Sequence, residues 1–75
     1  MENRIDNMQQ LLQHENKNVK LFALTVTDLM LSQGFYGRLQ REIVEMSQED
    51  LDKLINTLCE QDFKNTLDVI LWLEQ

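Results

Sequence analysis

The feature that most constrains this chain is that it contains no proline. Its 75 residues include two glycines, Gly34 and Gly37, and many leucine, glutamine and acidic residues. Proline breaks helices and these other residues favour them, so helices can form along nearly the whole chain. A chain this short has room for one hydrophobic core. The sequence therefore predicts a single all-α domain over residues 1–75.

Apolar residues recur at three-and-four spacing in several stretches, which predicts a compact orthogonal bundle of four to five short helices. The predicted helices cover residues 2–13, 19–33 and 35–46, a stripe from Leu51 to Leu58, and residues 66–75. A break is expected at 14–18, and one helix continuing through that polar stretch is the alternative. Because residues 19–33 are apolar on most sides, that helix is expected to be central. The last helix is expected to be largely buried.

Short polar residues mark where these helices begin and end. Ser47 is expected to cap the fourth helix and Asn65 the last one, by accepting hydrogen bonds from backbone amides three residues later. Asn16 and Asn18 are the two candidates for capping the helix that follows the break. Gly34 stands where a left-handed residue would end the 19–33 helix.

Charge divides the chain into two parts. The net charge is −6, but residues 1–41 hold four acids and five bases, whereas residues 42–75 hold nine acids and two bases. The acids around residues 42–52 are interpreted first as a solvated face that also suits a helix N-terminus. The alternative is an acidic patch that docks a basic partner or imitates the phosphates of DNA. Its candidate binding residues are Glu45, Glu49 and Asp52.

Two adjacent aromatic residues, Phe35 and Tyr36, stand between the glycines and before Arg38 and Arg41. The glycines predict a tight turn in which one ring enters the core and the other is partly exposed; which ring does which is left open. The functional hypothesis is a recognition corner in which Tyr36, Arg38 and Arg41 contact a partner, because tyrosine and arginine are enriched in binding hot spots.

A DNA-binding helix-turn-helix is the other interpretation of this corner. Its recognition helix would present Arg38 and Arg41, but Glu42 and Glu45 follow one turn later. Phosphates repel a domain with a net charge of −6, so the sequence argues against nucleic acid as a direct partner.

Catalytic, metal-binding and membrane functions find little support in the sequence. His14 is the only histidine and is interpreted as a solvated loop residue, and Cys59, the only cysteine, as a small core residue. A single histidine and a single cysteine cannot form a metal-ligand cluster or an intramolecular disulfide. The longest apolar run, 69–73, is far below the roughly 20 residues of a membrane-spanning helix. We expect a cytoplasmic protein without enzymatic activity, metal or cofactor.

Parts of the chain resemble small uncharacterised helical proteins that bacteria encode, often on phages and other mobile elements. The resemblance covers roughly residues 19–75 and lies in the pattern Ser-Gln-Gly-Phe-Tyr-Gly-Arg at 32–38, followed by the segments 43–46, 61–63 and 68–74. It implies a bacterial or phage setting and no particular activity.

Taken together, the sequence predicts a small acidic protein-interaction module or regulator. A protein partner is expected, and a homodimer is a second form of association, because added burial would stabilise so small a domain. The alternative function is a regulator related to nucleic acid, either a helix-turn-helix-like binder or an acidic DNA mimic.

Overall fold

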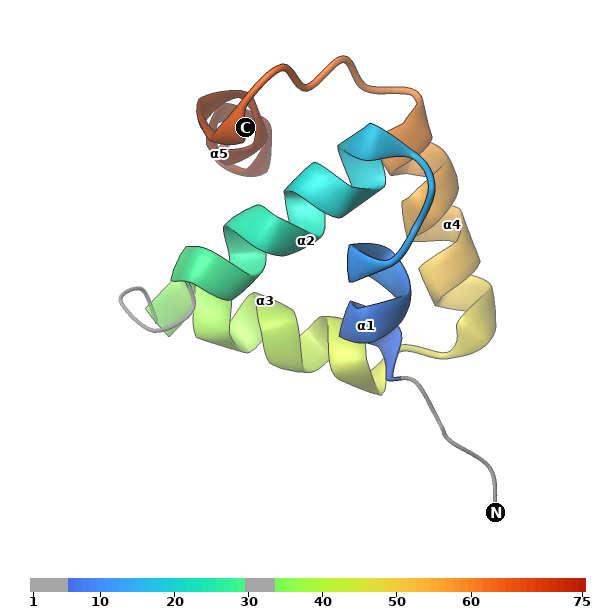
Figure 1. The fold of residues 1–75 in the computed structure, drawn as a ribbon. Helices are drawn as coiled ribbons and strands as arrows, with labels where there is room; N and C mark the ends of the chain where they lie inside the picture. Colours follow the sequence, from blue (N-terminus) through green and yellow to red (C-terminus); the bar gives the residue numbers. More distant parts are fainter. Residues whose placement is uncertain (1–5, 30–33) are drawn as a thin grey trace.

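The computed structural model shows five helices, and all of its secondary structure is α-helical in the part of the chain that it describes (Figure 1). It describes residues 6–29 and 34–75, and these ranges contain no strand. The helices are α1 (Asn7–Leu12), α2 (Lys17–Leu29), α3 (Gly34–Glu45), α4 (Gln48–Cys59) and α5 (Thr66–Leu73). The predicted fold class is confirmed.

Helix α2 lies at the centre, as its apolar composition predicts. It contacts each of the other four helices, which cross it in different directions (Figure 1). Val19, Phe22, Ala23 and Val26 are buried along it, and together they form the middle of the core. Because every other helix packs on α2, its position sets the placement of the surface features described below.

The break between the first two helices is confirmed. Helix α1 ends at Leu12, and the side chain of Asn16 then accepts hydrogen bonds from the amides of Asn18 (2.8 Å) and Val19 (3.3 Å). Asn16 is therefore the residue that satisfies the first amides of α2. Helix α1 is capped by Asp6 and is shorter than predicted, and residues 1–5 lie outside the described part of the chain.

The predicted caps of the last two helices are also confirmed. Ser47 Oγ accepts a hydrogen bond from the Asp50 amide at 3.2 Å, and Asn65 Oδ1 accepts one from the Asp68 amide at 3.1 Å. Each cap accepts a hydrogen bond from an amide in the first turn of its helix, which fixes the starts of α4 and α5.

The prediction for Gly34 is wrong. Gly34 is the first residue of α3, and no described glycine has a positive φ, so Gly34 is not a left-handed cap. The segment 34–37 forms the first turn of a helix instead of a tight turn. Glycine weakens a helix by about 1 kcal/mol, a cost that burial of Tyr36 and Ile43 on the inner side of α3 can offset. The predicted end of the preceding helix, residues 30–33, lies outside the described residues.

Helix α5 packs on α2 through aromatic rings. The ring of Trp72 meets Phe22 and Phe63 edge-on, with centroid distances of 6.2 and 5.7 Å. The expectation that this helix is largely buried is wrong on its outer side, where Leu67 is 59 % exposed and Leu71 is 53 % exposed. No helix packs over these two leucines within the described ranges, because α5 contacts chiefly α2.

Candidate functional site

One side of α3 presents an apolar hollow edged by charge. Phe35, Arg38, Leu39 and Glu42 line a depression of about 290 Å³. Their spacing of three and four places them on one stripe of the helix. Phe35 is 49 % exposed, Leu39 is half-buried, and the two charged residues are exposed. We call these four residues the α3 face.

The two aromatic rings left undecided by the sequence have separate positions. Tyr36 is buried, with 6 % of its surface exposed, and Phe35 lies outside with its ring edge-on to Tyr36 at 5.1 Å. The Tyr36 ring is therefore covered in the free chain, and Phe35 is the aromatic residue of this corner that is exposed to a partner. Helical spacing could have distinguished the two rings. Tyr36 is seven residues, or about two turns, before the buried Ile43 and lies on the same side of the helix, whereas Phe35 shares the stripe of Arg38 and Glu42.

The predicted charged candidates are all exposed, and on α3 acids and bases are paired. Arg38, Arg41, Glu42 and Glu45 lie on the outer side of α3, and each arginine has a glutamate one turn later, so the four charges cancel. The outer surface of α3 is thus close to neutral.

Glu49 and Asp52 lie on α4, a different helix from Glu45. Glu49 and Asp50 occupy the first turn of α4 behind the Ser47 cap, where negative charge is favourable to the helix dipole. Asp52 accepts a hydrogen bond from the Gln48 side chain at 3.0 Å. These positions agree with the solvated-face interpretation of the acidic residues.

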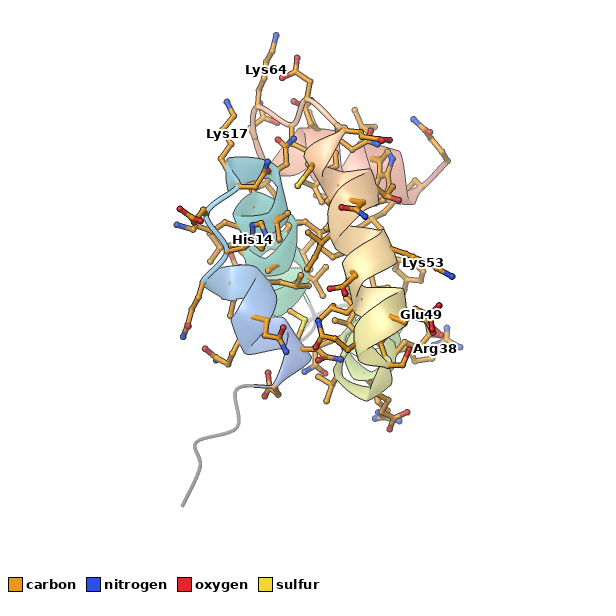
Figure 2. All side chains as sticks on the ribbon, turned by 90° about the vertical axis from the view of Figure 1, so that its right-hand side faces the viewer. His14, Lys17, Arg38, Glu49, Lys53 and Lys64 are labelled. Atoms are coloured by element: carbon orange, nitrogen blue, oxygen red, sulfur yellow. The ribbon has the colours of Figure 1, made fainter. Side chains whose placement is uncertain are left out.

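A second hollow, of about 300 Å³, lies between α2 and the connection from α4 to α5. Its apolar floor is formed by Leu21, Leu24 and Phe63. Its charged lining consists of Lys17, Lys20, Lys64 and Glu15. Figure 2 shows Lys17 and Lys64 at one end of the molecule, away from Arg38 and Lys53. We call this hollow the lysine-rimmed groove. No local sequence pattern indicates it, because its two sides are about 40 residues apart in the chain.

Asn18 holds the two sides of this groove together. Its buried side chain donates a hydrogen bond to the Gln61 carbonyl and accepts one from the Phe63 amide at 3.3 Å. A two-sided amide contact of this kind fixes the connection between α4 and α5 against the start of α2. Phe63 and Lys64 are placed beside Leu21 and Leu24 as a result.

The two residues considered for catalysis have ordinary surroundings. His14 is half-buried, and its Nδ1 accepts a hydrogen bond from the Asn16 amide at 3.0 Å, so that ring nitrogen has a structural role (Figure 2). Cys59 is exposed, which corrects the prediction of a core residue. The buried stripe of α4 contains Leu51 and Leu58, and the next position, Cys59, is turned about 100° away from it.

Two searches of residues 6–29 and 34–75 gave negative results. No group of three or more histidine, cysteine or acidic side chains is placed to hold a metal ion. No helix there is both long enough and apolar enough to cross a lipid bilayer.

Comparisons of the chain with protein-family models, curated protein sequences and solved structures found no match. The resemblance to small helical proteins of bacteria and phages therefore stays a prediction.

Proposed function

We propose that this chain is a non-enzymatic protein-interaction module that binds a partner protein through the α3 face. The observation that carries the proposal is the exposed ring of Phe35. Full burial of a phenylalanine side chain contributes about 1.5–3 kcal/mol, so a half-exposed ring leaves roughly 1 kcal/mol that a partner can recover.

The neighbours of Phe35 support the same proposal. The half-buried Leu39 extends the apolar surface, and the exposed Arg38 and Glu42 edge it with opposite charges. An aromatic centre next to arginine and surrounded by polar groups is the usual composition of an interface core and rim. Such a surface needs no cofactor.

The arrangement of charge favours protein over nucleic acid. Arg38 and Arg41 are each one turn from a glutamate, and the net charge of −6 opposes approach to phosphates. A DNA mimic would need an unbroken acidic array, but Glu45 lies one turn from Arg41 on α3 and Glu49 lies one turn from Lys53 on α4.

The proposal is tested by affinity capture from the encoding organism, with proteins identified by mass spectrometry. The test variant is Phe35→Ala with Arg38→Ala, and the matched control is Leu71→Ala with Lys53→Ala, which also removes one exposed apolar and one basic side chain. We expect the test variant to lose a partner that the control retains, with affinity reduced about thirtyfold for a hot-spot pair. Equal capture by both variants contradicts the proposal.

Three further measurements examine the alternatives. Light scattering distinguishes a homodimer from a monomer of 8.9 kDa. A salt-sensitive DNA gel shift that is lost in Arg38→Glu would support nucleic-acid binding and contradict the proposal. Turnover in a screen of hydrolase and transferase substrates, abolished by His14→Ala or Cys59→Ala, would contradict its non-enzymatic part.

A further inference from the structure

We propose that the lysine-rimmed groove binds an acidic amphipathic helix of a partner protein. Apolar side chains of that helix would lie on Leu21 and Leu24, and its carboxylates would face the ammonium groups of the rim. This surface is separate from the α3 face, so the proposal does not depend on the one made above.

The charge of the groove is opposite to that of the whole molecule. Three of the seven basic residues, Lys17, Lys20 and Lys64, line it with one acid, Glu15, whereas the chain as a whole carries −6. The screening length at physiological ionic strength is about 8 Å, so a short ligand responds mainly to charges near the groove. There the three lysines outnumber Glu15 and Asp68, whose carboxylate accepts a hydrogen bond from the Lys64 amide at 2.8 Å. A segment with several carboxylates is therefore attracted here, in spite of the net negative charge.

The floor of the groove indicates that the ligand also has an apolar side. Leu24 is 46 % exposed, and Leu21 and Phe63 continue the apolar surface beneath the lysines. A nucleic-acid backbone makes no use of such a floor, and the overall charge repels an extended polyanion. Leucine-like side chains would recover the hydrophobic free energy that Leu24 leaves at the surface.

The spacing of the groove residues on α2 suits contact with a partner helix. Lys17, Lys20, Leu21 and Leu24 follow one another at the spacing i, i+3, i+4 and i+7 along α2, a stripe about 10 Å long. Two turns of a partner helix present anchors at the same spacing. The Asn18 hydrogen bonds hold the opposite side of the groove in place, so little ordering is required on binding.

The experiment is an NMR titration of the full chain with a synthetic peptide of about 16 residues, long enough to form a helix on binding. Its leucines recur at three-and-four spacing and are flanked by glutamates. One control peptide has the same composition without the apolar stripe, and another has lysines in place of the glutamates. We expect the acidic amphipathic peptide alone to shift the amide signals of residues 17–24 and 63–64.

Two protein variants separate the local charge from the net charge. Lys17→Glu with Lys20→Glu is expected to weaken binding about tenfold. Arg41→Glu with Lys53→Glu changes the net charge equally at exposed positions outside the groove, and binding is expected to stay within about twofold of the original. Leu24→Ala, which also changes an exposed side chain, is expected to weaken binding without unfolding the protein, as circular dichroism will show.

Several results would overturn the proposal. These are an absence of shifts at about 1 mM peptide, equal binding of either control peptide, equal weakening by both double variants, and shifts confined to α3. Groove signals that move with protein concentration alone, together with a doubled mass, would assign the groove to a second copy of the chain. The same signals shifted by duplex DNA would assign it to phosphates. The variant Phe35→Ala with Arg38→Ala leaves the groove intact, so the proposal for the α3 face can fail without affecting peptide binding in the groove.

Discussion

At the scale of single residues, two asparagines connect distant parts of the chain. Asn18 joins α2 to the connection between α4 and α5. The Asn7 side chain donates hydrogen bonds to the carbonyls of Ile43 (2.7 Å) and Met46 (2.9 Å), at the C-terminal end of α3. The Ile43 carbonyl also accepts a hydrogen bond from the Met46 amide at 3.2 Å, so Asn7 adds a second donor there and ties the start of α1 to the end of α3.

Replacement of Asn18 by alanine is expected to lower the free energy of unfolding by about 2 kcal/mol, because it leaves the Phe63 amide and the Gln61 carbonyl without their partner in a buried place. Urea unfolding followed by circular dichroism measures the change. Asn56→Ala, at an exposed position of α4, is the control and should change stability by less than about 0.5 kcal/mol. Equal effects of the two substitutions would show that the Asn18 contacts contribute nothing.

At the scale of helices, the sequence predicts contacts between residues that are close in the chain and misses contacts between residues that are far apart. The caps at Ser47 and Asn65 act over three residues, and the sequence predicts both. The contacts of Asn7 and Asn18 span 36 to 45 residues, and no local pattern reveals them. The lysine-rimmed groove escaped prediction for the same reason.

The error at Gly34 has a different origin. Two glycines three residues apart favour a turn locally, but helical spacing also lets Tyr36 enter the core beside Ile43. Tertiary burial determines the outcome in such a case, and propensity is a weak guide. The spacing that places Tyr36 inside also identifies Phe35 as exposed.

Gly34→Ala tests the helical assignment directly. A Cβ at Gly34 would meet nothing within 4 Å, and its φ is not positive. Alanine should therefore stabilise the protein by about 0.5–1 kcal/mol, seen as a higher urea midpoint. If Gly34 were left-handed, the same substitution would instead lower the stability of the protein by about 1–2 kcal/mol. Ser47→Ala, which removes a cap, should lower stability by about 1 kcal/mol in the same assay.

At the scale of the whole molecule, α2 makes the five helices one cooperative unit. Each of the other helices contacts it, and Trp72 on α5 meets the α2 residue Phe22. Unfolding in urea should therefore follow one transition, with coincident curves from Trp72 fluorescence and from far-ultraviolet circular dichroism. A fluorescence change at lower urea than the loss of helix would show instead that α5 separates first.

The placement of charge also belongs to this scale. The sequence correctly separates a nearly neutral first part from an acidic second part, but linear order does not show which charges become neighbours. Folding places Lys64, from the acidic part, beside Lys17 and Lys20. The candidate sites of a small acidic domain are thus defined by its few basic residues as much as by its many acids.

The span of the Asn18 contacts has a consequence for a chain that is still being synthesised. Asn18 and the core residues of α2 are synthesised well before Gln61 and Phe63. The Asn18 side-chain amide therefore lacks these two hydrogen-bond partners until the later segment emerges. An early collapsed form would have to bury this polar group unpaired or leave the start of α2 open to water. The same asparagine that secures the finished fold therefore disfavours closure of an incomplete one.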